Sequence, residues 1–428
     1  MQWIDFQQTR ERRLGQAQLD EEQNRAKNFG IVGHALVRGV AGAGKSLVLR
    51  NRVEQIVEQK LSSVLVLSYN RFMRGWLQAK LYEKQISVEC DTFHAWVWRH
   101  LGYSYEYDKD IEKRQNLIDL AEQSKLKYEA ILVDEAQDFY DEWFQVLLKV
   151  LDQTTNSLFF VYDNTQSVYG QAHRRKSGWS WRNLGIDVVG RSQIFDLNYR
   201  NAPEILEVAW KFIYPALEKA GMKVDRKENS PSIDKLIEPK KKPSRSSGVQ
   251  PLLLQLPYAE MAMEIAKQVK LALDSYADSS IGILLHPTEP KMKVLKTALS
   301  QELRRLGVPH HAPMQSGERF GNVVDRPLVV VDSWNALKGV EFDAVVIVGI
   351  DAISEQTEQT EQTEQTEQTE QTEKSKSGDD QDFEAKAGLY TAMTRARDHL
   401  VMLYETKTPV VEQVEMTIRA PNQLMSGE

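Results

Sequence analysis

The segment at residues 39–46 constrains the fold of this chain more than any other. It reads Gly-Val-Ala-Gly-Ala-Gly-Lys-Ser and fits the phosphate-cradling pattern G-x-x-x-x-G-K-[ST]. That pattern needs a buried strand before it and a helix after it, and residues 35–38 and 47–59 have strand-like and helical patterns. The sequence therefore predicts an α/β unit whose first loop binds phosphate.

The residue types in this loop indicate how it would hold a nucleotide. Gly39, Gly42 and Gly44 let backbone N–H groups close around phosphate oxygens, at the positive end of the helix dipole. Lys45 is expected to reach the β- and γ-phosphates, and the Ser46 hydroxyl is expected to ligate Mg²⁺. We therefore expect the cofactors ATP and Mg²⁺.

Two adjacent carboxylates, Asp134 and Glu135, follow the apolar run at residues 130–133. Ligands of open α/β sheets lie at the carboxyl ends of strands, which is where this pair is expected. Asp134 would hold Mg²⁺ together with Ser46, and Glu135 would accept a proton from an attacking water. The pair and the cradle together predict hydrolysis of a nucleotide.

Strand-like apolar runs alternate with longer helical patterns along the chain. The strand candidates are residues 35–38, 64–67, 130–133, 158–161, 194–197, 252–256, 281–285, 328–331, 344–348 and 400–403. The helical candidates include residues 47–59, 143–151, 203–220, 259–275 and 291–306. This alternation predicts an α/β fold of βαβ units with mostly parallel sheets, and 428 residues suffice for two or three domains.

Composition excludes some classes of protein. Hydrophobic content of 41% and charged content of 27% are ordinary for a globular chain, and no apolar run approaches the ~18 residues of a membrane helix. The first residues lack the pattern of a secretion signal. The single cysteine, Cys90, excludes an internal disulfide and fits a reducing cytosol. We expect a cytoplasmic protein with no membrane partner.

The net charge of −7 is dominated by one segment. Residues 355–384 hold eight Glu, three Asp and two Lys, a net of −9, so that the remainder carries +2. Bulk charge therefore neither supports nor excludes nucleic acid. Residues 355–373 are six Glu-Gln-Thr copies and a final Glu, and we predict a disordered surface expansion at about 355–382. The alternative is an acidic interaction tail.

A second polar stretch runs from about residue 225 to 249. Its Pro, Lys and Ser content, concentrated at residues 239–248, predicts a solvated linker loop. The alternative is a basic strip that contacts phosphates.

Further blocks occur in an order that resembles one protein family. The cradle, Asp-Glu-Ala-Gln-Asp at residues 134–138 and the blocks described below resemble the UvrD/Rep (superfamily 1) DNA helicases, from about Leu19 to Tyr404. The resemblance implies two tandem RecA-like P-loop NTPase domains, at residues 1–195 and 196–428, with ATP in the cleft between them. It also implies ATP-driven translocation 3′→5′ on single-stranded DNA, in DNA repair, recombination or replication.

Five residues have nucleotide roles that the resemblance implies. Gln23, in Leu-Asp-Glu-Glu-Gln at residues 19–23, would read the adenine edge, because an amide both donates and accepts. Gln166 would sense the γ-phosphate, and Tyr199 would stack on adenine. Arg200 would act as an arginine finger, and Arg395 as a second one, since a planar guanidinium suits phosphoryl oxygens.

The block at residues 333–343 resembles the family's motif V. Gly339 and Glu341 would lie at the nucleotide, with Glu341 near the ribose or the attacking water. Two positions depart from the family pattern. Leu47 stands where an arginine often covers the other adenine face, and Asn335 stands where histidine is usual. The chain therefore lacks the arginine on one face of the base and the histidine of motif V that the family uses.

The resemblance also implies contacts with single-stranded DNA. An aromatic ring such as that of Tyr69 can stack on a base, and a hydroxyl such as that of Thr92 can bond to a phosphate. Trp179 and Trp181 lie among cations downstream, and packing against the next strand is an equal alternative for both. The predicted DNA-binding residues are Tyr69, Asn70, Thr92, His94, Tyr169, Trp179 and Ser333.

The spacing of the blocks departs from the family in size. Residues 95–133 and 309–327 number 39 and 19, which is too short for the large 1B and 2B insertions. The chain therefore resembles a motor core alone, and it supports ATP hydrolysis and translocation more directly than duplex unwinding.

Two other functions remain open from the sequence. One is an ATP-switched nucleic-acid clamp that serves a protein partner, and the other is an RNA-directed enzyme. The presence of Glu135, Gln166, Arg200 and Arg395 favours repeated turnover over a clamp. The sequence leaves the choice between DNA and RNA, the loading partner and the oligomeric state undecided.

Overall fold

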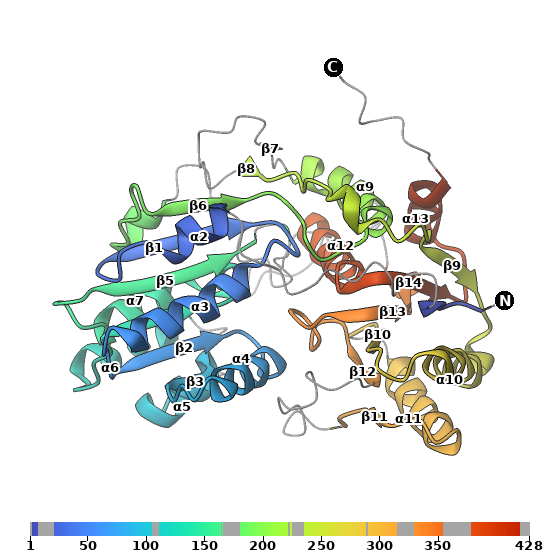
Figure 1. Cartoon of the computed structure of the whole chain (residues 1–428), viewed down its shortest axis with the longest axis horizontal. Coiled ribbons are helices and arrows are strands. Elements are labelled where there is room, and N and C mark those ends of the chain that lie inside the picture. Colours follow the sequence, from blue (N-terminus) through green and yellow to red (C-terminus); the bar gives the residue numbers. More distant parts are fainter. Residues whose placement is uncertain are drawn as a thin grey trace, which may run out of the picture.

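The computed structural model contains two six-stranded parallel β-sheets, each covered by helices on both faces (Figure 1). It describes residues 2–6, 21–104, 111–163, 165, 180–220, 223–224, 235–287, 290–314, 329–353 and 378–419. We call the first sheet with its helices the first domain, and the second sheet with its helices the second domain. The predicted α/β fold with mostly parallel sheets is confirmed.

The first sheet has six parallel strands in the order β3-β2-β4-β5-β1-β6. The strands are β1 His34–Gly39, β2 Val64–Ser68, β3 Glu89–Thr92, β4 Ala130–Val133, β5 Ser157–Tyr162 and β6 Ser192–Phe195. Only β5 separates β1 from β4, so the loop after β1 and the carboxylates after β4 lie close together at one edge of the sheet. The strand predicted at residues 194–197 begins and ends two residues earlier, at Ser192 and Phe195.

Helices bury both faces of this sheet. They are α2 Glu21–Lys27, α3 Lys45–Glu58, α4 Arg71–Glu83, α5 Phe93–Leu101, α6 Ile111–Gln123 and α7 Asp141–Val150. Apolar side chains of α2, α3 and α4 form one core, and those of α5, α6 and α7 form the other. Because both faces are covered, the central strands β4 and β5 are mainly apolar runs without alternation.

The second sheet is also six-stranded and parallel, in the order β11-β12-β10-β13-β14-β9. Its strands are β9 Leu252–Gln255, β10 Ile281–Leu285, β11 His310–His311, β12 Val329–Ser333, β13 Phe342–Val348 and β14 Ala396–Tyr404. Its helices are α9 Pro203–Lys219, α10 Tyr258–Ser275, α11 Pro290–Arg305, α12 Gly378–Met393 and α13 Pro409–Arg419. Helices α9, α12 and α13 cover one face, and α10 and α11 cover the other.

The beginning of the chain departs from the predicted division at residue 195. Trp3, Ile4 and Phe6 are buried in the core of the second domain, beneath α10. The Trp3 backbone N–H donates to Gln268 Oε1 at 2.9 Å, and the ring of Phe6 meets that of His399 edge-on at 5.5 Å between centroids. Figure 1 shows this segment beside the second sheet. The first residues therefore pack with the second domain, because three apolar side chains are buried there.

The basic stretch predicted as a solvated linker is bound to the chain around it. Residues 235–249 are described, and they include β8 Lys235–Leu236, which pairs with β7 Lys223–Val224. Asn198 N donates to Lys240 O at 3.0 Å, and Lys240 N donates to Asp196 O at 2.7 Å. The Arg245 guanidinium is buried against Asp398 at 2.8 Å. These bonds hold residues 235–249 against the turn that follows β6, which corrects the prediction of a solvated linker loop for this part of the stretch. Residues 225–234 lie outside the described ranges.

Several predictions concern residues outside the described ranges. Gln166, Tyr169, Trp179 and the Glu-Gln-Thr repeat at 355–373 are among them. In the part of the chain that the structure describes, no helix has the length and apolar character needed to cross a membrane.

Candidate active site

The phosphate-cradling loop joins β1 to α3, as its pattern predicts. Gly42 and Gly44 have φ of 67° and 84°, in the left-handed region that glycine tolerates. A Cβ on Gly42 would lie 2.7 Å from Arg200 Cβ, and one on Gly44 would lie 2.5 Å from Gln23 Nε2. Both glycines are therefore required by backbone conformation and by close neighbours. Gln23 Nε2 also donates to Ala43 O at 2.9 Å, which brings the predicted adenine reader to the cradle.

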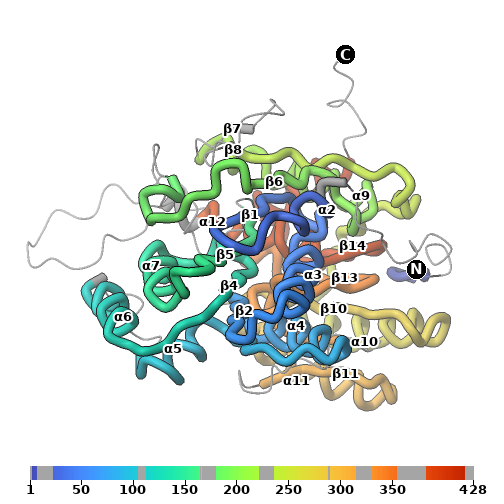
Figure 2. Tube along the Cα trace, turned by 60° about the vertical axis from the view of Figure 1, so that its left-hand side comes forward, coloured from blue at the N-terminus to red at the C-terminus, as the bar shows by residue number. Residues whose placement is uncertain are grey.

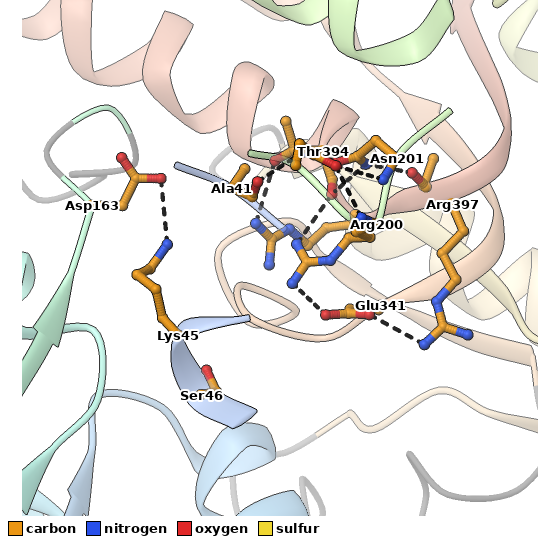
Figure 3. Close-up of polar contacts among 12 residues, drawn as sticks. Ala41, Lys45, Ser46, Asp163, Arg200, Asn201, Glu341, Thr394 and Arg397 are labelled. Atoms are coloured by element: carbon orange, nitrogen blue, oxygen red, sulfur yellow. Dashed lines mark hydrogen bonds and ion pairs between the residues drawn. The ribbon is translucent and has the colours of Figure 1, made fainter. Parts of the chain in front are cut away.

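Lys45 lies across this loop and points toward the first sheet (Figure 3). Its Nζ donates to Gly39 O at 3.0 Å and to Val40 O at 2.9 Å, and it lies 3.7 Å from Asp163 Oδ2. Burial lowers the pKa of Lys45, while the charges of Asp163 and Glu135 raise it. Sequence reasoning missed Asp163, although it lies two residues after the strand-like run at 158–161 and directly follows β5.

Ser46 and Asp134 come together as predicted for a magnesium site. Ser46 Oγ donates to Asp134 Oδ2 at 3.0 Å, across the space between the start of α3 and the end of β4. Burial and the adjacent Glu135 raise the pKa of Asp134, as expected for two neighbouring buried carboxylates. A hydroxyl and a carboxylate are oxygen ligands of the kind Mg²⁺ takes beside phosphates, so the pair fits the ion.

Glu135 has an unusual backbone conformation for a side chain of its size. Its φ of 54° and ψ of 44° are left-handed, which is uncommon outside glycine and concentrates at functional sites. Its carboxylate accepts a hydrogen bond from Gln137 Nε2, and Gln137 Oε1 accepts one from Asp163 N at 3.0 Å. Burial raises the pKa of Glu135, but the charges of Lys338, Lys45 and Arg395 together lower it. The carboxylate is therefore ionised at neutral pH.

The turn after β6 brings the second domain against the cradle. Tyr199 N donates to Gly42 O at 3.0 Å, and Asn198 Nδ2 donates to Ala41 O at 2.7 Å. Lys242 Nζ lies 4.7 Å from the centroid of the Tyr199 ring, within cation–π range. Asn198 and Lys242 were not predicted. Asn198 directly precedes the predicted Tyr199 in the sequence, whereas no sequence signal connects Lys242 to Tyr199.

Arg200 is held by a carboxylate of its own domain. Its guanidinium forms an ion pair with Glu341, whose other oxygen accepts from Arg397 Nη2 at 3.1 Å (Figure 3). Arg200 Nη1 also donates to Thr394 O at 3.4 Å. Burial raises the pKa of Glu341, but Arg200 and Arg397 outweigh it and bring the pKa to about 2. Glu341 is thus a bridge between two arginines.

Arg395 follows α12 and is buried, with an exposed fraction of 2%. Its Nε donates to Thr391 O at 2.9 Å, and its Nη2 donates to Thr394 Oγ1 at 3.3 Å. Burial and the charge of Arg200 lower the pKa of Arg395 to about 10, so that it remains a cation at neutral pH. The two predicted fingers and Glu341 therefore lie together at the junction between the domains.

Three of the predicted DNA-binding residues cap helices or turns. The side-chain oxygens of Asn70, Thr92 and Ser333 each accept from the backbone N–H three residues later, at 2.9, 3.3 and 3.3 Å. Capping of this kind satisfies backbone donors that would otherwise have no partner. The structure thus explains these residue types without DNA, and their contact with a strand stays a prediction.

The predicted aromatic contacts divide between half-buried and buried rings. Tyr69 is half-buried against the core that α5, α6 and α7 cover. The ring of His94 meets Trp143 edge-on, with 4.9 Å between centroids. Trp181 is buried, and its ring lies 4.5 Å from that of Phe160. Trp181 therefore packs in the core, against β5, the strand that precedes it in the chain.

A family model matches a segment of the first domain. Residues 27–172 match the family model described as an AAA domain, a range that contains the cradle, β4 and the carboxylate pair. This match supports a P-loop nucleotide-binding domain in this part of the chain. No curated protein matches the chain. The C-terminal domain of a possible DNA helicase from Lactobacillus plantarum WCFS1 is similar over 51% of this chain and 96% of its own. Its 15% identity and TM-score of 0.30 are too low to assign a function.

Proposed function

We propose that this protein is a motor that hydrolyses ATP between two RecA-like domains and translocates along single-stranded DNA. One observation carries the proposal. Tyr199 N bonds to the cradle at Gly42 O, 3.0 Å away, so the turn that bears Arg200 lies against the loop that bears Lys45. A phosphate in the cradle would therefore face groups from both domains. The proposal includes the resemblance to UvrD/Rep helicases and the 3′→5′ direction that it implies.

Binding would begin with the cradle. Its backbone N–H groups and the start of α3 favour an anion, and Lys45 would exchange its bonds to Gly39 O and Val40 O for phosphate oxygens. Ser46 and Asp134 would hold Mg²⁺, which neutralises charge on the β- and γ-phosphates when bound. Gln23 is placed beside the loop, where it would read the base.

Glu135 is the group we assign to the proton of the attacking water. Its carboxylate is ionised at neutral pH and is oriented by Gln137, as a general base must be. The Asp163 backbone N–H donates to Gln137 Oε1 at 3.0 Å, directly after β5. The side chain that orients Glu135 is therefore held by the end of that strand.

Arg200 and Arg395 are assigned to the charge that develops on the transferred phosphoryl group. Because Arg200 is paired with Glu341, it would exchange that carboxylate for phosphate oxygens on binding. Through this exchange, binding and hydrolysis of ATP would change the contacts of Arg200 and Glu341 in the second domain. If each domain holds the strand in turn, closing and opening would become translocation.

The test is ATP hydrolysis measured with Mg²⁺, alone and with single-stranded DNA or RNA. We expect stimulation by single-stranded DNA. No stimulation by either polymer would overturn the motor. Stimulation by RNA alone would identify an RNA-directed enzyme, and strand binding without repeated turnover would identify an ATP-switched clamp. Strand displacement from a partial duplex then separates unwinding from translocation.

A further inference from the structure

A buried ion pair joins the two domains beside the carboxylate assigned to catalysis. Lys338 Nζ bonds to Asp138 Oδ2, and the two side chains have exposed fractions of 1% and 0%. Lys338 lies in the loop between β12 and β13 of the second domain. Asp138 ends the short 3₁₀ helix Ala136–Asp138 of the first domain, which begins directly after Glu135.

The backbone around Lys338 is also held by the first domain. Asn70 Nδ2, at the start of α4, donates to Lys338 O at 2.6 Å. The next residue, Gly339, has φ of +87°, and a Cβ there would lie 2.5 Å from Met73 Cγ. Contacts between the domains therefore set the position of the Lys338 ammonium. If the domains separated, the ammonium would move away from Asp138.

The turn that carries Glu135 is restrained at several points. Asp138 N donates to Glu135 O at 3.1 Å, and the Glu135 carboxylate accepts from Gln137. The ion pair with Lys338 fixes the far end of the same turn. A buried carboxylate whose partner is removed is strongly destabilised, so Asp138 and its turn are expected to rearrange when Lys338 is absent.

We propose that Lys338 is a positioning residue that the second domain supplies, and that it holds the Glu135 turn in its hydrolytic geometry only when the domains are together. This inference rests on the proposed ATP hydrolysis and extends it. Hydrolysis would thereby depend on domain closure, while binding of the nucleotide to the first-domain cradle would not. The alternative is a pair that merely stabilises the interface.

The test compares Lys338→Met, Asp138→Asn and the double variant in the full chain. The measurements are kcat and KM for ATP, binding of a fluorescent ATP analogue, and thermal stability. We expect kcat to fall at least tenfold in each single variant, with analogue affinity within threefold of wild type. Because both residues act through one contact, the double variant should lose no more than the worse single variant. Lys338→Arg, which keeps the charge, should recover part of the loss.

The matched control is Lys296→Met. Lys296 Nζ forms a buried ion pair with Asp332 at 2.9 Å, and both residues belong to the second domain. This variant should lower thermal stability while leaving kcat, measured without DNA, within twofold of wild type.

The outcomes separate this inference from the proposed function. If the wild-type protein does not hydrolyse ATP, both fail. If it does, a Lys338→Met variant that keeps its kcat, or loses kcat and analogue affinity together, overturns the positioning role alone. Should Lys338→Met not fold, Asp138→Asn decides, because it keeps the side-chain volume, and an unchanged kcat there refutes the inference.

Discussion

The guanidinium of Arg200 is paired with the carboxylate of Glu341, at the junction where the second domain meets the phosphate-cradling loop. Figure 2 shows the first domain in front of the second domain. The pair satisfies a partly buried arginine with a carboxylate that a phosphate can replace, since both are anionic acceptors for a planar guanidinium. We therefore infer that the proposed arginine finger is paired with Glu341 until a phosphate replaces that carboxylate.

Removal of this finger should affect the rate of hydrolysis more than binding. We expect Arg200→Ala to reduce kcat for ATP by roughly 10³-fold, because a finger stabilises charge that develops only in the transition state. Steady-state hydrolysis and binding of a fluorescent ATP analogue provide the measurement. Arg182→Ala, at an exposed position outside the site, is the control and should match wild type. An unchanged kcat in Arg200→Ala would remove Arg200 from the mechanism.

Substitutions of Lys45 and Glu135 should distinguish nucleotide binding from ATP hydrolysis. Lys45→Ala removes the cation of the cradle, and we expect both turnover and nucleotide affinity to be lost. Glu135→Gln should keep affinity and lower kcat at least 10²-fold, because an amide cannot accept the proton. Lys80→Ala, on the outer surface of α4, is the control. A Glu135→Gln enzyme with normal turnover would refute the assignment of the base.

Because His399 is buried, we expect the protein to be less stable in mild acid than at neutral pH. Burial lowers the pKa of His399 from 6.5 to about 4, so the unfolded chain binds a proton at a higher pH than the folded chain. The free energy of unfolding is highest above pH 6.5, where His399 is neutral in both states. It falls as the pH is lowered toward 4, because the unfolded chain then binds a proton that the folded chain does not. Between pH 7 and pH 5 the free energy of unfolding should fall by about 2 kcal/mol from this group. Urea unfolding of wild type and His399→Gln at both pH values tests this, and an equal change in the two proteins would contradict it.

Because Phe6 is buried in the second domain, we expect the beginning of the chain to stabilise that domain. Phe6→Ala removes a buried ring from the core beneath α10 and should cost about 3 kcal/mol of unfolding free energy. Calorimetry and urea unfolding provide the measurement. Tyr82→Ala is the control, since Tyr82 is 83% exposed and should change stability by less than about 0.5 kcal/mol. A Phe6→Ala protein as stable as this control would show that the buried Phe6 ring contributes nothing to stability.

Local patterns predicted the parts of the site that lie within one strand–loop–helix unit. The loop at 39–46 and the pair Asp134-Glu135 follow buried strands in the structure, as expected. These predictions succeed because strand, glycine turn and helix start are adjacent in sequence. Their positions at one edge of the sheet then follow from the parallel topology.

Contacts between distant segments were not predictable in this way. The sequence contains no periodicity that pairs Lys338 with Asp138, or Lys242 with Tyr199. Sequence reasoning missed two further contacts for the same reason. They are the bonds between residues 235–249 and the turn after β6, and the burial of Trp3 and Phe6 in the second domain. Each depends on where one packed unit places a side chain relative to another.

The sequence by itself determined the phosphate-binding loop, the carboxylate pair and the parallel α/β class, because backbone conformation and apolar patterning are local properties. Only the tertiary structure decided that Arg200 is paired with Glu341 and that a lysine of the second domain is buried beside the Glu135 turn. The reason is physical: the strength of a charge pair depends on separation and on burial, and both are set when the two domains pack together.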